Sequence, residues 1–216
     1  MVETGIQRAS AVERELAQQA KLAFSNAEFK RTHQVLETLN QSSSCDDVQL
    51  FTIYMQLRLD ALAGLRRSVD DTLVMLELLR ARLAILGSWP LHWYIQAWLT
   101  VPSLEERRVD PVYLYHLTGE LPSVVHRQDC LLLAVDYAVV YSEHHFIALL
   151  EADSPFGMAW LAAPFHHAMV DGLLAAYRCD MGALQVATNG LKQTAGSPLE
   201  EFEIKRFCRR FAHLLS

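Results

Sequence analysis

The hydrophobic positions along this chain recur at the spacing of a helix rather than that of a strand. Leu73, Leu76, Leu79 and Leu83 illustrate apolar residues three or four positions apart, and runs that alternate apolar with polar residues are few. Leu, Ala, Arg, Glu and Gln are abundant, whereas there are only 9 Gly and 7 Pro. The sequence therefore predicts an all-α protein made of antiparallel helical hairpins.

Capping residues mark where several of these helices begin. Ser10 precedes Glu13, and Ser197 precedes Glu200, with Pro198 at the first helical position; both spacings fit a capping box. Ser103 before Glu106 has the same capping-box spacing, and Asp110 before Pro111 and Ser154 before Pro155 are related signals. We expect helices over residues 10–25, 27–40, 46–64, 69–86, 89–100, 111–118, 123–150, 155–177, 180–193 and 198–215.

The length and composition indicate one folded domain. The chain has 216 residues, of which 51% are hydrophobic, and this is enough to bury a substantial core. We expect a single all-helical domain over residues 1–216, with possible sub-parts at 1–86 and 89–216.

Two helix pairs look alike at a shift of 40 residues. Thr32, Val35, Leu36, Glu37 and Leu39 correspond to Thr72, Met75, Leu76, Glu77 and Leu79, and Tyr177 to Leu191 gives a weaker third copy. This pattern resembles the tetratricopeptide-like repeat, which implies stacked helical hairpins and a protein-binding role. A generic helical bundle is the alternative.

The net charge of −6 is concentrated in the middle of the chain. Residues 109–180 hold nine acidic residues against Arg127 and Arg178, a net of −7. Because such a surface repels phosphate, we expect no nucleic-acid partner, and we interpret Lys205, Arg206, Arg209 and Arg210 as a solvated helix face. The acidic segment would attract a protein with a basic contact surface, or it would only keep an apolar protein in solution.

The candidate partner-binding residues lie in this acidic segment. Tyr113 and Tyr115 are about 200° apart on a helix, so at most one should be buried and the other is the candidate anchor. The accompanying carboxylates are those of Glu120, Asp129, Asp136, Glu143, Glu151 and Asp153. Trp89, Trp93 and Trp98 form an aromatic cluster that could lie in the core or at an interface.

One motif suggests catalysis. Residues 166–172 read HHAMVDG and match HHxxxDG, so they resemble the motif of the chloramphenicol acetyltransferase and condensation family. The resemblance implies a CoA-dependent acyltransferase, with His167 as the general base, Asp171 as its structural partner and a mixed sheet around them. The Ala-rich segment before the motif does not predict the strand that this family requires. If His167 is instead a buried structural residue, its replacement by Ala should cost about 1–3 kcal/mol.

Metal binding is a second alternative, because two histidine doublets occur with acidic residues nearby. They are His144 with His145 and His166 with His167. Adjacent residues on a helix point about 100° apart, so each doublet would give at most one ligand to a shared site. Structural histidines are the simpler interpretation, and we expect no cofactor.

These observations favour a binding protein over an enzyme. The N-terminus lacks the pattern of a secretory signal, and the four cysteines form no CxxC pair, so we expect a cytoplasmic protein with reduced thiols and no membrane span. The function expected is that of a protein-binding module. By analogy of type alone, it could be an immunity protein that neutralises a cognate basic toxin. The oligomeric state is left open.

Overall fold

The computed structural model describes residues 9–63, 74, 77–78, 111–121, 123–152 and 163–215. Every regular element in these ranges is an α-helix, which confirms the all-α prediction for this part of the chain. The chain divides into two compact units, residues 1–108 and 109–216. That division falls later than the expected boundary between residues 86 and 89, and the single domain over 1–216 stays a prediction.

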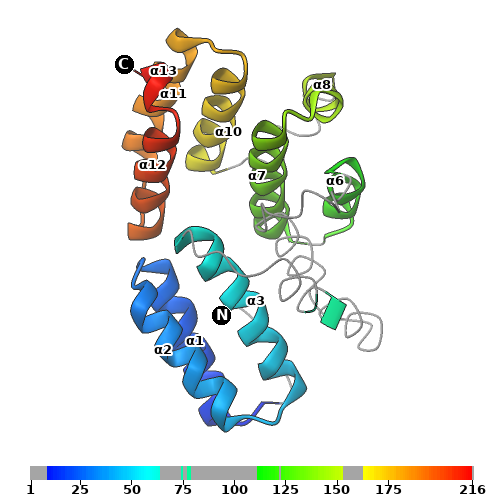
Figure 1. Ribbon diagram of the computed structural model, residues 1–216, viewed down its shortest axis with the longest axis vertical. Helices are drawn as coiled ribbons and strands as arrows, with labels where there is room; N and C mark the ends of the chain where they lie inside the picture. The colour runs from blue at the N-terminus through cyan, green and yellow to red at the C-terminus, as the bar shows by residue number, and fades with distance from the viewer. Residues whose placement is uncertain are drawn as a thin grey trace. The chain divides into compact units, whose positions relative to one another are not determined.

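The described part of the first unit is a layer of three helices. α1 (Ala11–Ser25), α2 (Phe29–Ser42) and α3 (Asp46–Ala63) pack side by side, as Figure 1 shows. Their shared core includes Ala17, Ala20, Leu36, Leu39 and Phe51, all buried. Thr32 of α2 is also buried, with its hydroxyl donating to the carbonyl of Glu28. Three of the repeat positions, Thr32, Leu36 and Leu39, thus face the core in this copy, whereas Glu37 is exposed.

The N-terminus of α1 has the capping box that the sequence predicts. The Ser10 hydroxyl accepts from the amide of Glu13, and the Glu13 carboxylate accepts from the amide of Ser10 at 2.6 Å. Glu13 also accepts a hydrogen bond from the hydroxyl of Ser43 at the end of α2. The bonds from Ser43 and Ser10 stabilise the carboxylate and so lower the pKa of Glu13. One side chain therefore fixes the start of α1 and ties it to the end of α2.

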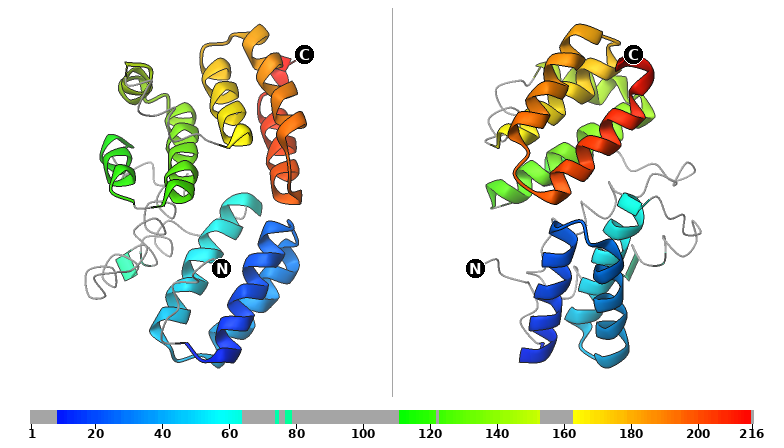
Figure 2. Two further views of the ribbon diagram at one scale, coloured as in Figure 1. Left: turned by 180° about the vertical axis from the view of Figure 1, so that it is seen from behind. Right: turned by 90° about the vertical axis from the view of Figure 1, so that its left-hand side faces the viewer.

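The second unit is arranged around α7. Its helices are α6 (Pro111–Gly119), α7 (Val124–Tyr141), α8 (His144–Ala152), α10 (Pro164–Tyr177), α11 (Met181–Thr194), α12 (Pro198–Arg210) and α13 (Ala212–Leu215). Figures 1 and 2 show α6, α8 and α10 beside α7, with α11 against α10 and with α12 and α13 against α11. Leu131, Phe146, Leu173, Leu184 and Leu191 are among the fully buried side chains of this unit.

Gly172 allows α10 to approach its neighbours closely. A Cβ atom at this position would lie 2.8 Å from Cζ of Phe207 in α12 and 3.5 Å from Cβ of Ala187 in α11. The final glycine of the HHxxxDG match is therefore explained by helix packing.

Two expected helices are each broken in two. The helix expected over 123–150 ends at Tyr141, because Ser142 adopts a left-handed conformation with φ 55°, and α8 begins at His144. The helix expected over 198–215 is interrupted at Phe211, whose φ of −104° and ψ of 21° are not helical. Neither break has a glycine or proline, and the apolar spacing continues across both, so the sequence predicts an uninterrupted helix at each place.

Two helix starts also differ from expectation. Of the helix expected over 155–177, residues 155–162 lie outside the described residues, and α10 begins at Pro164, because the residue before a proline is disfavoured in the helical conformation and Ala163 is extended. The helix expected from residue 27 begins at Phe29, since Ala27 has a φ of 56°. The expected helices 69–86 and 89–100, and the caps at Ser103, Asp110 and Ser154, lie outside the described residues, apart from residues 74, 77 and 78.

Within the described residues, no helix combines the length and the apolar character needed to cross a membrane.

Candidate functional site

Two aspartates of α7 hold two other helices of the second unit. Asp129 and Asp136 are seven residues apart, which places them on the same face of α7 about two turns apart. Oδ1 of Asp129 lies 3.1 Å from Nε2 of His166 in α10, and Oδ1 of Asp136 accepts from Arg210 at the end of α12. Both carboxylates were expected to bind a partner, and the structure gives each a contact within the unit.

His166 is the least exposed member of this arrangement. Its side chain is 19% exposed, and its Nδ1 atom is buried with no hydrogen-bond partner among the described residues. Burial disfavours the charged imidazolium, but the hydrogen bond and charge of Asp129 and the charges of Glu203 and Glu200 in α12 outweigh it. The net result is a raised pKa for His166. Carboxylates from α7 and α12 thus act on one imidazole from α10.

His167 faces a different environment from His166. Its Nδ1 atom lies 3.0 Å from Oδ2 of Asp171 one turn later on α10, and the two side chains are 44% and 50% exposed. The structure therefore brings together the two residues that the acyltransferase resemblance singles out. It places them inside a helix, and the residues that the structure describes contain no strand. The strand context that the resemblance implies is thus wrong for residues 163–177.

The histidine doublets do not converge. Nδ1 of His144 contacts the hydroxyl of Tyr177, His145 is exposed, and His166 and His167 bind separate aspartates. Among the residues that the structure describes, no group of three or more His, Cys, Asp or Glu side chains is placed to hold a metal ion.

Tyr115 belongs to the core. It is 3% exposed, and its ring meets that of Phe146 edge to face at a centroid distance of 5.7 Å. The side chain of Tyr113 lies outside the described residues, so Tyr113 remains the candidate anchor.

The remaining acidic candidates differ in exposure. Glu120 is exposed at the end of α6 and makes no ion pair within the described residues, and Val124, the first residue of α7, is 50% exposed. We call Glu120, Ser123 and Val124 the α6–α7 corner. Glu143 is half-buried between α7 and α8, whereas the side chain of Glu151 and all of Asp153 lie outside the described residues.

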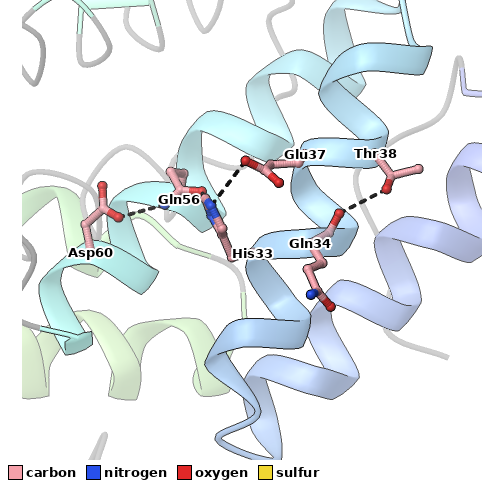
Figure 3. Close-up of polar contacts among 6 residues, drawn as sticks. All are labelled: His33, Gln34, Glu37, Thr38, Gln56 and Asp60. Atoms are coloured by element: carbon pink, nitrogen blue, oxygen red, sulfur yellow. Dashed lines mark hydrogen bonds and ion pairs between the residues drawn. The ribbon is translucent and has the colours of Figure 1, made fainter.

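A polar chain between α2 and α3 is not evident from the sequence. Figure 3 shows Gln56 between His33 and Asp60: its amide nitrogen donates to Oδ1 of Asp60 at 2.7 Å, and its amide oxygen lies 3.3 Å from Nδ1 of His33. Because amide and carboxylate oxygens only accept here, each nitrogen of His33 forms its hydrogen bond when it carries a proton. Nε2 of His33 then lies 3.3 Å from Glu37. The chain connects an exposed imidazole with a carboxylate that is 6% exposed.

Asp60 and Gln56 are four residues apart on α3, but His33 comes from α2, 23 residues earlier. Sequence spacing could reveal the first pair and not the second. With only His33 and Glu37 at its exposed end, the chain orients one imidazole and does not complete a metal site.

The sequence matches no protein-family model, no curated protein and no solved structure. The aromatic cluster of Trp89, Trp93 and Trp98 lies outside the described residues.

Proposed function

We propose that this chain is a protein-binding module and not an enzyme, and that its partner docks at the α6–α7 corner. The observation that carries the proposal is the pairing of an exposed apolar side chain, Val124, with the exposed carboxylate of Glu120 at one turn of the fold. An interface needs an apolar anchor for affinity and benefits from charge for rapid encounter, and this corner offers both.

The rest of the acidic segment supports this choice by elimination. Asp129 contacts His166, Asp136 accepts a hydrogen bond from Arg210, and Tyr115 is buried. Of the expected partner-binding residues whose side chains are described, Glu120 is the one that is exposed. Tyr113, in α6 on the N-terminal side of the corner, is proposed as a further anchor.

On this proposal the partner presents a basic contact surface and meets the module in the cytoplasm. An immunity protein that neutralises a basic toxin is the specific form of this function that the charge favours. Nucleic acid is an unfavourable partner for the same corner, because Glu120 would repel the phosphate backbone.

The test uses the full chain as bait in an extract of its native host, followed by binding kinetics with the purified partner. Replacing Val124 with Asp should weaken binding through a faster dissociation rate, because an apolar anchor is lost. The Glu120→Lys variant should mainly slow association. A partner that binds both variants like the unmodified protein would place the interface elsewhere.

Acyl transfer is the second candidate, favoured by the contact between His167 and Asp171. A carboxylate at Nδ1 is the arrangement that orients an imidazole for action as a general base at Nε2. This candidate function requires a measurable acyl-transfer activity that disappears when His167 is replaced.

A further inference from the structure

An open groove of about 350 Å³ lies between α11 on one side and α12 with α13 on the other. It is lined by Gln185, Thr188, Lys192, Cys208, Ala212 and Leu215. The hydroxyl of Thr188 already donates to the carbonyl of Leu184 at 2.8 Å, so it needs no further partner. Ala212 and Leu215 add apolar surface, and the groove can therefore accept an apolar side chain.

An exposed apolar side chain lies on α11 next to the groove. Met181 is 65% exposed and precedes Gln185 by four residues, so the two share one face of the helix. An exposed methionine in line with a groove suits a ligand of extended length, because its flexible side chain adapts to different apolar surfaces.

Basic residues lie in the groove and beside it. α11 and residues 204–215 contain five Lys or Arg residues, and the three glutamates of α12, at 200, 201 and 203, lie before this stretch. Arg210 is paired with Asp136, whereas the other four are exposed and form no ion pair within the described ranges; they are Lys192, Lys205, Arg206 and Arg209. Lys192 lines the groove itself, and Lys205 lies one turn before Cys208 on α12.

We propose that this groove is a second binding site, which takes an acidic peptide segment that carries apolar side chains. The lining accepts the apolar side chains, and Lys192 in the groove and Lys205 beside it attract the carboxylates. A nucleic-acid strand would use the cations and leave the apolar lining unused, so the peptide fits the whole surface better. The site is independent of the α6–α7 corner and would bind a segment of opposite charge.

The direct test is fluorescence anisotropy with the full chain and a labelled peptide of 12 residues that repeats Glu-Glu-Leu-Leu. A peptide of 12 Glu and an oligothymidylate of 12 nucleotides serve as comparison probes. We expect the Glu-Leu peptide to bind at least about tenfold more tightly than either. Equal binding of the all-Glu peptide or of the oligonucleotide would overturn the proposal, because the surface would then recognise any anion.

Two groove variants and one control, all at exposed positions, locate the site. The double variant K192E/K205E should weaken peptide binding at least about tenfold, since it reverses two of the four exposed cations. Ala212→Trp should do the same by filling the groove, whereas Gln193→Trp, at an exposed position of α11 that does not line it, should have no effect. Circular dichroism would verify that each variant is folded. Unchanged affinity in both groove variants would contradict the proposal.

Cysteine chemistry gives an independent readout in the unmodified protein. Cys208 is half-buried in the groove, and Cys179 is exposed in the turn between α10 and α11. The Glu-Leu peptide should slow alkylation of Cys208 by iodoacetamide and leave Cys179 unaffected, as measured by peptide mapping with mass spectrometry. Slowing at neither cysteine, or equally at both, would show that the peptide does not occupy the groove.

Discussion

Asp129 and His166 are partners on different helices, 37 positions apart in the chain and with 3.1 Å between Oδ1 and Nε2. This contact ties α10 to α7 through a group that can change its charge near neutral pH. A second contact from the same face of α7 joins Asp136 to Arg210 of α12.

The stability of the protein should fall as pH rises through the titration of His166. Its pKa in the folded protein lies above the ordinary value of 6.5, so the contribution of the charged pair is fully present below pH 6.5 and is lost above the folded-state pKa. His166→Gln retains a donor and cannot become charged. At about pH 5.5 the free energy of unfolding of this variant should be about 1–2 kcal/mol lower than that of the unmodified protein. The difference should shrink near pH 8.5.

Chemical denaturation at the two pH values measures this difference. His145→Gln is the matched control, because His145 is exposed and its loss should leave the pH dependence unchanged. A difference for His166→Gln that stays constant or grows with pH would refute the role given to the pair.

Gly172→Ala should destabilise the protein by about 1–3 kcal/mol, because overpacking forces neighbouring groups to move. The added Cβ would lie 2.8 Å from the ring of Phe207, which is buried and packs against Phe211 at a centroid distance of 4.9 Å. Phe207→Leu in the same chain should recover part of the loss. Gly190→Ala is the control: its Cβ would meet only Ala168 at an ordinary 3.5 Å, so thermal unfolding should occur at the same or a higher temperature. Equal effects of the two glycine substitutions would contradict the packing argument.

His167→Ala should change stability by less than about 0.5 kcal/mol, because surface pairs of this kind contribute little. The larger loss expected for a buried imidazole does not apply, since His167 is 44% exposed. If the proposed binding function is right, the protein should release no thiol from acetyl-CoA beyond the blank, with or without His167. Thiol release that disappears in a folded His167→Ala variant would establish the acyltransferase instead.

Gln56→Met should cost about 1–2 kcal/mol, because it removes the hydrogen bond to the buried Asp60 and the link to His33. Gln34→Met, on the exposed face of α2 in Figure 3, should be neutral. Urea denaturation of the two variants checks the comparison, and equal midpoints would show that the polar chain contributes nothing to stability.

Sequence reasoning succeeded where structure depends on local chemistry. Ser10 and Ser197 cap α1 and α12 as their spacing to Glu13 and Glu200 indicates. It missed the end of α7 at Ser142, because the left-handed position that ends a helix is usually predicted from a glycine and here is a serine.

The roles of Asp129 and Asp136 were missed for a different reason. Their seven-residue spacing shows that they share a face of α7, but their partners lie 37 and 74 residues away. A charge count therefore assigns them to the surface, and only the packing of α10 and α12 reveals what they bind.

The most direct test of the proposed function is the association rate of the captured partner at about 50 mM and 300 mM salt, because surface charges are screened over roughly 6 Å at the higher concentration. We predict that association slows with added salt, and that Glu120→Lys slows it further at low salt. Glu201→Lys, an equal charge change at an exposed position of α12, should not. A rate that ignores salt and responds equally to both variants would contradict docking at the α6–α7 corner.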